Sequence, residues 1–272
     1  MTATNGTFFK KLKRCDRLRR SLFPYLTPVF LLSFCGSVQT LHPGNTETLS
    51  LTDSRQALVV PTSGWKSNRG EAQLFERERP GAPWEPKGLK MAVNVGRKGL
   101  GWGLGLYGSS EGKGPIKQEG DGKSPAGVFR IGSAFGYAPR DSAAFIRLPY
   151  ISIDAITECV DDPDSDNYNL IVSRQRVSKV DWNSSEQMLR RDQQYKWGAV
   201  IEHNSAGRLK RGGSCIFLHI WEGPSIPTNG CTSFAEEDLI AILRWLRPEA
   251  NPVLVQLPQA EYLRLRDPWK LP

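Results

Sequence analysis

The chain has 272 residues, which is enough for one domain of about 200 residues with a true hydrophobic core or for two small ones, and we expect one domain. Its 26 glycines and 19 prolines favour turns over long helices, so a mainly β protein is expected. The formal net charge is +8, but residues 1–20 hold seven Lys or Arg against Asp16 alone, which leaves +2 for the rest. This distribution argues against a basic surface that binds nucleic acid.

Residues 1–37 have the pattern of an export signal. A basic start is followed by the short apolar stretch LFPYLTPVFLLSFCGSV and by small residues. Two alternatives stay open: a lipoprotein signal ending at Cys35, and an uncleaved segment that anchors the protein in the membrane. Pro24 and Pro28 disfavour a stable spanning helix. We therefore expect an exported protein.

Residues 38–55 are polar, lack periodicity and are expected to be a linker. From Gln56 to residue 258 the sequence predicts one sheet-based domain, and residues 259–272 are expected to be a C-terminal tail. The predicted strands are short, β-branched or aromatic-rich, and bounded by turn residues. They are QALVVP, EAQLFERE, LKMAVNV, GWGLGLYG, GVFRIG, NLIVS, GAVIEH, SCIFLHI and PVLVQL.

Two helices are predicted. Ser233–Glu236 fits a capping box, and apolar residues follow at the spacing of one helical face until Pro248 stops the run. These apolar residues are Leu239, Ile242, Leu243 and Leu246. A second, weaker helix is predicted over Ser185–Arg191.

Three cysteines remain if Cys15 and Cys35 belong to the leader: Cys159, Cys215 and Cys231. An oxidising compartment would tend to pair two of them. The alternative is that all three are buried as small hydrophobes. The sequence leaves open whether Cys159 and Cys215 pair.

The predicted strand SCIFLHI contains a histidine, His219. Alternation divides its side chains into two sets: Ile216, Leu218 and Ile220 toward the core, and Cys215, Phe217 and His219 on the opposite face. His219 thus stands at the strand's end, where an eleven-residue loop with two prolines and two glycines leads to Cys231. Such a loop closes easily and can bring the two side chains together.

A thiol and an imidazole in proximity are suited to nucleophilic catalysis. Cys231 lies just ahead of the predicted helix, whose N-terminal dipole favours the reactive thiolate, and His219 could take up and return the proton. Gly230 would let a substrate carbonyl approach the backbone N–H groups near Cys231, which could hold an oxyanion. The competing interpretation is a structural histidine and a packed thiol.

Resemblance to a known family favours the catalytic interpretation of Cys231 and His219. HIWEGPSIPTNGCTSF, with Thr228-Asn229-Gly230-Cys231, resembles the cysteine signature of the L,D-transpeptidase catalytic domain (YkuD-like) family. Further blocks resemble a bacterial branch of that family in the same order, over roughly residues 56–258. These blocks are EGDGKSPAGVFRIGSAFGY, ECVDDPDSDNYN, DWNSSEQM and GSCIFLHIW. Several ordered blocks are more specific than one short motif.

The resemblance implies a mainly β, mixed-sheet or β-sandwich domain with one or two short helices, one of them after the cysteine. It places the nucleophile on Cys231, the proton donor and acceptor on His219, and the oxyanion-forming backbone on Gly230 and Cys231. It assigns the orientation of the histidine to the backbone carbonyl of Ile220. No metal and no organic cofactor are implied.

The chain departs from the family pattern at three points. Asn229 replaces the common histidine before Gly-Cys, Ser233 replaces the arginine often found after the cysteine, and the spacing from histidine to cysteine is shorter than usual. Without that basic side chain a substrate carboxylate needs another partner, and Lys117, Lys123 or Arg130 could substitute. The substrate-binding candidates are Trp221, Thr228, Asn229, Ser233 and Lys123.

Other motifs carry weaker signals. GKGPIKQEGDGKSPAG lacks the spacing of a phosphate-binding loop, and DDPDSDNYN lacks the glycine and the closing carboxylate of a calcium loop, so both are interpreted as turns and no metal site is predicted. His203 is expected to be structural, with a pocket-lining role as the alternative.

The resemblance thus implies an exported enzyme of the bacterial cell envelope or periplasm that acts on peptidoglycan stem peptides and not on nucleic acid. It would release D-alanine and crosslink stems through a cysteinyl thioester. The alternatives are an L,D-carboxypeptidase-type hydrolase of stem peptides, in which water replaces the acceptor amine, and a non-catalytic wall-binding module.

Overall fold

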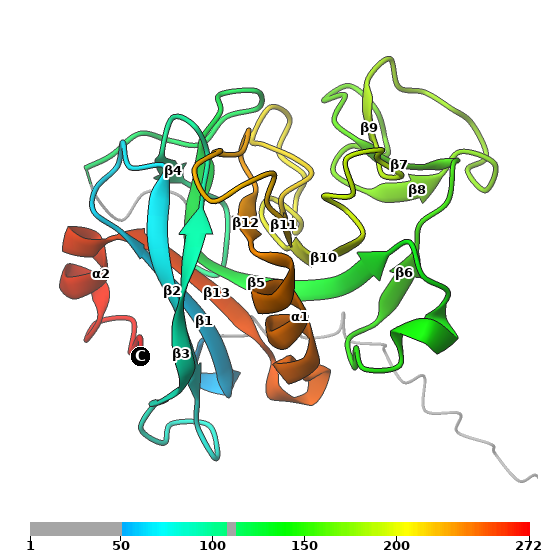
Figure 1. The fold of residues 1–272 in the computed structure, drawn as a ribbon. Coiled ribbons are helices and arrows are strands. Elements are labelled where there is room, and N and C mark those ends of the chain that lie inside the picture. The colour runs from blue at the N-terminus through cyan, green and yellow to red at the C-terminus, as the bar shows by residue number, and fades with distance from the viewer. Residues whose placement is uncertain (1–50, 108–112) are drawn as a thin grey trace, which may run out of the picture. The chain divides into compact units, whose positions relative to one another are not determined.

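The computed structural model describes residues 51–107 and 113–272. Short strands dominate this part of the chain, and two α-helices accompany them (Figure 1). The strands are β1 (Gln56–Thr62), β2 (Arg69–Glu76), β3 (Glu85–Asn94), β4 (Leu100–Trp102), β5 (Ser124–Gly136), β6 (Tyr150–Ser152), β7 (Thr157–Val160), β8 (Ile171–Ser173), β9 (Ser185–Gln187), β10 (Trp197–Ile201), β11 (Phe217–Ile220), β12 (Thr232–Phe234) and β13 (Val253–Pro258). The helices are α1 (Glu236–Trp245) and α2 (Gln259–Leu265), and the 3₁₀ turns are η1 (Leu51–Asp53), η2 (Arg140–Ala143) and η3 (Pro248–Ala250).

The main sheet has ten strands in the order β10-β11-β12-β3-β2-β1-β13-β5-β4, with β6 also paired to β5. The long strand β5 pairs with β13 and β4 through its first part and with β10 and β6 through its second, so the sheet closes on itself (Figure 1). Parallel pairs such as β1 with β13 and β11 with β12 occur beside antiparallel ones. The predicted mainly β, mixed-sheet fold is confirmed.

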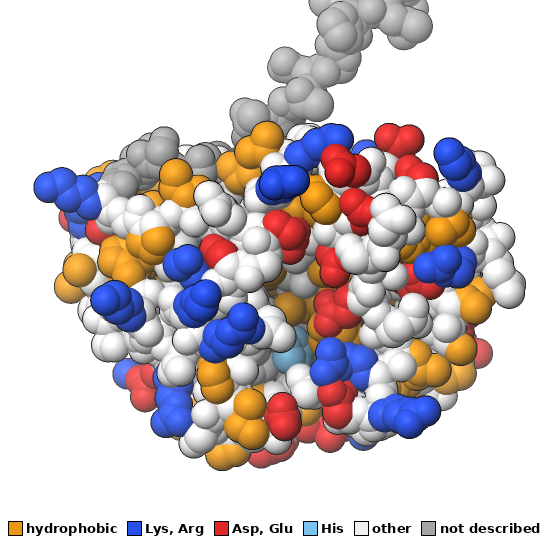
Figure 2. All heavy atoms as spheres, turned by 90° about the horizontal axis from the view of Figure 1, so that it is seen from above, with side chains coloured by type: hydrophobic (Ala, Val, Ile, Leu, Met, Phe, Trp, Pro, Cys, Tyr) orange, Lys and Arg blue, Asp and Glu red, His pale blue; other side chains and the backbone are white. Residues whose placement is uncertain are grey.

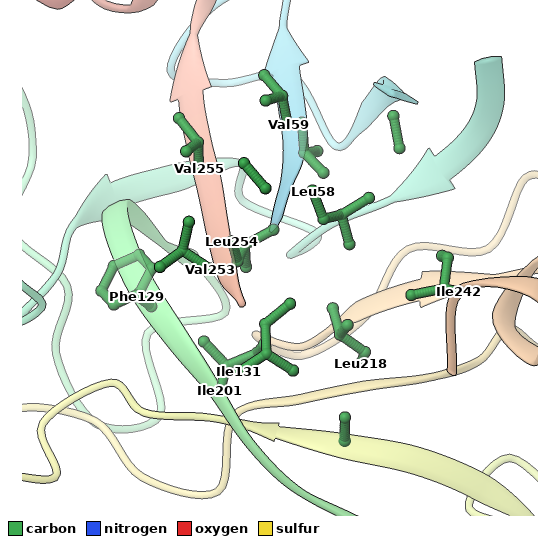
Figure 3. Packing of buried hydrophobic residues seen from close by; sticks show 14 of the residues in the cluster. Leu58, Val59, Phe129, Ile131, Ile201, Leu218, Ile242, Val253, Leu254 and Val255 are labelled. Atoms are coloured by element: carbon green, nitrogen blue, oxygen red, sulfur yellow. The ribbon is translucent and has the colours of Figure 1, made fainter. Parts of the chain in front are cut away.

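The core lies inside this closed sheet. Buried side chains converge from β1, β13, β5 and β11, for example Leu58, Leu254, Phe129 and Leu218, and Ile242 of α1 covers them (Figure 3). β13 is buried along its whole length, as is usual for a strand that is covered on both faces. The continuous apolar run PVLVQL therefore predicted this strand correctly.

Helix α1 forms where the apolar spacing predicted it, but its start differs. Leu239, Ile242 and Leu243 are its buried face, whereas the N-cap residue is Ala235 and no side chain caps the helix. The predicted capping box at Ser233 is wrong, because Ser233 belongs to β12 and pairs with His219 and Asn94.

A second sheet of three strands, in the order β8-β7-β9, lies beside the main one (Figure 1). The helix predicted over Ser185–Arg191 is wrong, because Ser185 and Glu186 pair as strand β9 with β7. Buried Glu158 of β7 holds this small sheet together by accepting hydrogen bonds from Arg174 (2.5 and 2.8 Å) and from Ser185 (2.6 Å). The interaction with Arg174 is the main cause that lowers the pKa of Glu158, to about 2.

Both ends of the described chain pack against the domain. Residues 259–272, expected to be a tail, form α2 and place Leu265, Trp269 and Leu271 in the core. Within the expected linker, Leu51 is buried and its carbonyl accepts a hydrogen bond from Arg77 (2.7 Å). The predicted signal or anchor at residues 1–37 and most of the linker lie outside the described residues. No helix in the described ranges is long and apolar enough to span a bilayer.

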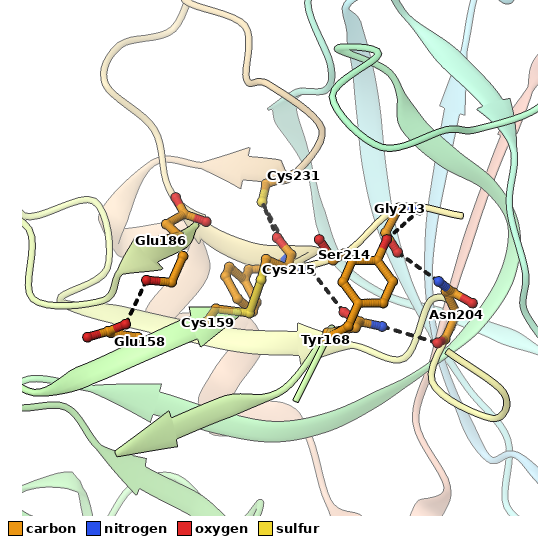
Figure 4. Close-up of a disulfide and its surroundings, with 12 residues drawn as sticks. Glu158, Cys159, Tyr168, Glu186, Asn204, Gly213, Ser214, Cys215 and Cys231 are labelled. Atoms are coloured by element: carbon orange, nitrogen blue, oxygen red, sulfur yellow. Dashed lines mark hydrogen bonds between the residues drawn. A yellow bond between two sulfur atoms is a disulfide. The ribbon is translucent and has the colours of Figure 1, made fainter. Parts of the chain in front are cut away.

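A disulfide joins the small sheet to the main one. Cys159 of β7 is bonded to Cys215, which lies two residues ahead of β11, with the Cα atoms 6.0 Å apart (Figure 4). Of the alternatives left open by the sequence, pairing is therefore the one that holds, and Cys231 is the free cysteine of the described chain.

This bond closes a loop with a sequence separation of 56 residues and restricts the unfolded chain accordingly. We expect the double variant Cys159→Ala/Cys215→Ala to lose about 2–4 kcal/mol of unfolding free energy, measured by denaturant titration. Reductant should destabilise the wild type to a similar extent and leave the double variant unchanged. Equal stability of both proteins under oxidising conditions would contradict this role of the disulfide.

Candidate active site

Parallel pairing of β11 with β12 brings His219 and Cys231 to the same face of the sheet. In this register Leu218 pairs with Thr232 and His219 with Ser233. Cys231, directly ahead of β12, therefore stands beside Phe217, whose amide nitrogen lies 3.3 Å from its sulfur. Because side chains two positions apart on a strand share a face, Cys231 and His219 project to the same side.

Both residues line one cavity of about 480 Å³, which we call the Cys231 cavity. The main sheet supplies one side through His219 and the segment Thr228–Cys231, and residues on and around the small sheet supply another through Asp161, Glu186 and Arg190. Figure 2 shows a hollow on this face with a histidine inside it, and both acidic and basic side chains around it. The structure thus unites the predicted thiol and imidazole in one concave site.

The backbone around Cys231 is held rigidly. Its carbonyl oxygen accepts hydrogen bonds from the hydroxyls of Thr228 (2.6 Å) and Ser124 (2.8 Å). Gly230 is tightly enclosed, since a Cβ there would lie 3.2 Å from the carbonyl oxygen of Lys123. These contacts fix the direction in which the thiol enters the cavity.

The thiol of Cys231 is neutral in this structure. It is 9% exposed, and its sulfur lies 3.4 Å from the carbonyl oxygen of Cys215, a distance suited to a weak S–H donor (Figure 4). Burial, followed by the charge of Glu186, raises the pKa of the Cys231 thiol to about 12. The expected resting thiolate is therefore wrong. The helix N-terminus, one of its two assumed causes beside His219, does not adjoin Cys231, because β12 separates Cys231 from α1.

His219 is buried and neutral as well. Its Nδ1 lies 2.7 Å from the carbonyl oxygen of Ile220, and because a carbonyl only accepts, Nδ1 carries the proton and Nε2 is left as a free acceptor. Burial lowers the pKa of His219 to about 4. The ring packs edge-on against Tyr195, with centroids 5.3 Å apart. The carbonyl that the family resemblance assigned to the histidine is thus in contact with it.

The remaining predicted residues divide into two groups. Thr228, Asn229 and Gly230 line the Cys231 cavity, and exposed Asn229 contacts Arg97. The others are not among its lining residues: Trp221 is partly exposed elsewhere, Ser233 is 1% exposed within β12, and Lys123 contributes only its backbone near Gly230. The amide of Gly230 donates to the hydroxyl of Thr228 (3.1 Å), so it is already engaged.

Of the three basic residues considered as substitutes for the family arginine, Lys117 alone lines the Cys231 cavity. It is 4% exposed and forms an ion pair with Asp121 (2.8 Å). Arg130 lines other cavities. His203 is structural, since its Nδ1 accepts from the amide of Leu104 (3.1 Å) and its Nε2 contacts the carbonyl of Gly212 (2.9 Å).

Sequence reasoning missed the side of the cavity that the small sheet provides. The ring of Tyr195 packs edge-on against His219, and its hydroxyl donates a hydrogen bond to Glu186 (2.5 Å). The guanidinium of Arg190 lies 4.9 Å from the centroid of the Tyr195 ring. Glu186 lies within the block DWNSSEQM, but Tyr195 and Arg190 belong to no block that resembles the family. The place of Glu186 at the cavity depends on the pairing of β9 with β7, which the sequence did not reveal.

Comparison with known proteins gives one result. The family model described as L,D-transpeptidase catalytic domain (YkuD) matches residues 84–255, which include His219 and Cys231. No curated protein and no solved structure matches the chain significantly.

The raised thiol pKa leads to a chemical prediction. At neutral pH the thiolate fraction of Cys231 should be roughly a thousandfold below that of an unfolded thiol, whose ordinary pKa is 9.0. Iodoacetamide should therefore label Cys231 slowly at pH 7, and the rate should rise about tenfold per pH unit up to about pH 11. Mass spectrometry follows the labelling, and the protein in denaturant is the control. A rate that is already constant with pH near neutrality would show a resting thiolate instead.

Proposed function

The chain belongs to the L,D-transpeptidase catalytic domain (YkuD) family, and from this premise we propose that it crosslinks peptidoglycan stem peptides through a thioester on Cys231. Its substrates would be a tetrapeptide stem as acyl donor and the amine of a second stem as acceptor. D-Alanine is the leaving group. The observation that carries the proposal is the single cavity that holds both the Cys231 thiol and the free Nε2 lone pair of His219.

Acylation begins from a neutral pair. As the sulfur of Cys231 attacks the carbonyl ahead of D-alanine, its proton passes to Nε2 of His219, while Nδ1 keeps its contact with Ile220. The proton then goes to the departing amine, so the C–N bond breaks and the thioester remains. We assign stabilisation of the developing oxyanion to the backbone N–H of Cys231, because the N–H of Gly230 already donates to the hydroxyl of Thr228.

Deacylation repeats these steps in reverse. An amine of the acceptor stem attacks the thioester, His219 takes its proton and the sulfur leaves to recover the thiol. The thioester conserves the free energy of the cleaved amide, so no nucleotide is consumed. If water replaced the amine, the same residues would catalyse hydrolysis, and the outcome depends on how well the cavity excludes water.

The non-catalytic alternative is less well supported. A binding module would retain the cavity but would have no use for a free thiol beside a histidine whose tautomer is set by a carbonyl. The Cys159–Cys215 disulfide also supports export, because disulfides persist in oxidising compartments such as the bacterial periplasm. We therefore propose that the enzyme acts in the cell envelope, and that residues 1–37 direct it there.

Defined muropeptides test this function. The wild type should convert tetrapeptide stems into crosslinked dimers with release of D-alanine, detected by mass spectrometry. Cys231→Ala should abolish the products, and His219→Gln should reduce them by at least about a hundredfold, since general acid–base catalysis contributes that much. Asp164→Asn, which removes an exposed charge paired with Lys210, is the matched control.

Trimmed monomers without dimers would assign the hydrolase instead. Binding of stems without any turnover would assign the wall-binding module.

A further inference from the structure

The small-sheet side of the Cys231 cavity carries more negative than positive charge. Asp161 follows β7 directly, and Glu186 belongs to β9, and both line the cavity. Arg190, also in the lining, is shared between Glu186 (3.3 Å) and Asp192 (2.5 Å). One guanidinium is thus shared by two carboxylates, and Asp161 forms no ion pair in the described ranges.

Asp161 is the most unusual of these groups. Its Oδ1 is completely buried yet accepts no hydrogen bond. Within the described residues, one other buried side-chain atom lacks a hydrogen-bond partner, and this is Nε1 of Trp102. Leaving a carboxylate oxygen in this state is costly, since buried charges are normally paired. The chain thus leaves this oxygen of Asp161 without a partner, at the edge of a cavity that a bound molecule could occupy.

Glu186 faces the same space and is also incompletely balanced. One of its oxygens accepts from Tyr195 (2.5 Å) and contacts Arg190, while the side chain remains 29% exposed toward the cavity. Burial is the main cause that raises the pKa of Glu186, and the charge of Asp161 adds to it. The two carboxylates are therefore close enough to repel each other electrostatically.

An ammonium group fits this pair better than other cations do. It brings one positive charge and three hydrogen-bond donors, which match two carboxylates. A calcium ion takes six to eight oxygen ligands, and the described residues contain no group of three or more His, Cys, Asp or Glu placed to hold a metal. In the proposed donor stem, the residue ahead of D-alanine, whose carbonyl is attacked, is diaminopimelate, and its side chain carries a free amine.

We propose that Asp161 and Glu186 form the subsite that binds the side-chain ammonium of the acyl-donor stem. The identity of the occupant rests on the proposed function. The subsite would select stems with a free amine at this position over stems in which the amine is acylated.

Occupation of the subsite would also act on the nucleophile. The charge of Glu186 is the second cause that raises the pKa of Cys231. A bound ammonium offsets that charge, so the thiol becomes easier to deprotonate when the donor is in place. Substrate recognition and nucleophile activation are then coupled through one carboxylate.

Binding to the full chain carrying Cys231→Ala tests the subsite without turnover. Isothermal titration should compare the tetrapeptide stem bearing the free diaminopimelate amine with the same stem acetylated at that amine. The acetylated stem should bind at least about tenfold more weakly, because it loses a charge-assisted contact. Adding Asp161→Asn or Glu186→Gln should weaken the free-amine stem by a similar factor and leave the acetylated stem unchanged. Asp164→Asn, an exposed carboxylate of the same segment, should change neither affinity.

The outcomes separate this inference from the proposed function. Equal affinity for both stems, discrimination that survives Asp161→Asn and Glu186→Gln, or no binding of either stem would each overturn the subsite. Discrimination that depends on these carboxylates, combined with no dimer or trimmed product from the wild type, would retain the subsite and reject the function. The acetylated stem also controls for folding, because a variant that is misfolded would lose affinity for this stem as well.

Discussion

The short parallel pairing of β11 with β12 is the constraint on which the site depends. Three residue pairs set the register, and this register places Cys231 one step outside the strand, on the same face as His219. A slip of one residue would turn Cys231 toward the core, because side chains alternate between faces. The hydroxyls of Thr228 and Ser124, both directed at the carbonyl of Cys231, secure the register where strand pairing ends.

The small sheet supplies one side of the Cys231 cavity, and the main sheet supplies another. The opposite face of β11 packs Ile216, Leu218 and Ile220 into the main core, as alternation predicted, but the face with Phe217 is buried too, within a smaller cluster that includes Cys159 and Met188. This cluster and the disulfide hold the small sheet in place. Burial at this place lowers the pKa of His219 and raises that of Cys231, which favours the uncharged form of each.

The sequence predicted features that depend on long periodic patterns and missed those that depend on a few tertiary contacts. The buried strands and the apolar face of α1 follow from such patterns. Strands β6, β7, β9 and β12 have three or four residues, too few for alternation to be distinguished from chance. Ser233 matched a cap and Ser185 a helix start, yet cross-strand pairing outweighed these local preferences. Tyr195 and Arg190 lie in the irregular segment between β9 and β10, so no spacing indicated them.

The uncharged state of Cys231 also has a consequence for the lifetime of the protein. Peroxides and disulfides react with thiolates, and the rate follows thiolate content and access. A free cysteine close to the Cys159–Cys215 bond would otherwise be at risk of sulfenic acid formation and of exchange into a wrong pairing. Because burial raises the pKa of Cys231 and leaves the residue only 9% exposed, both reactions should be slow at this thiol.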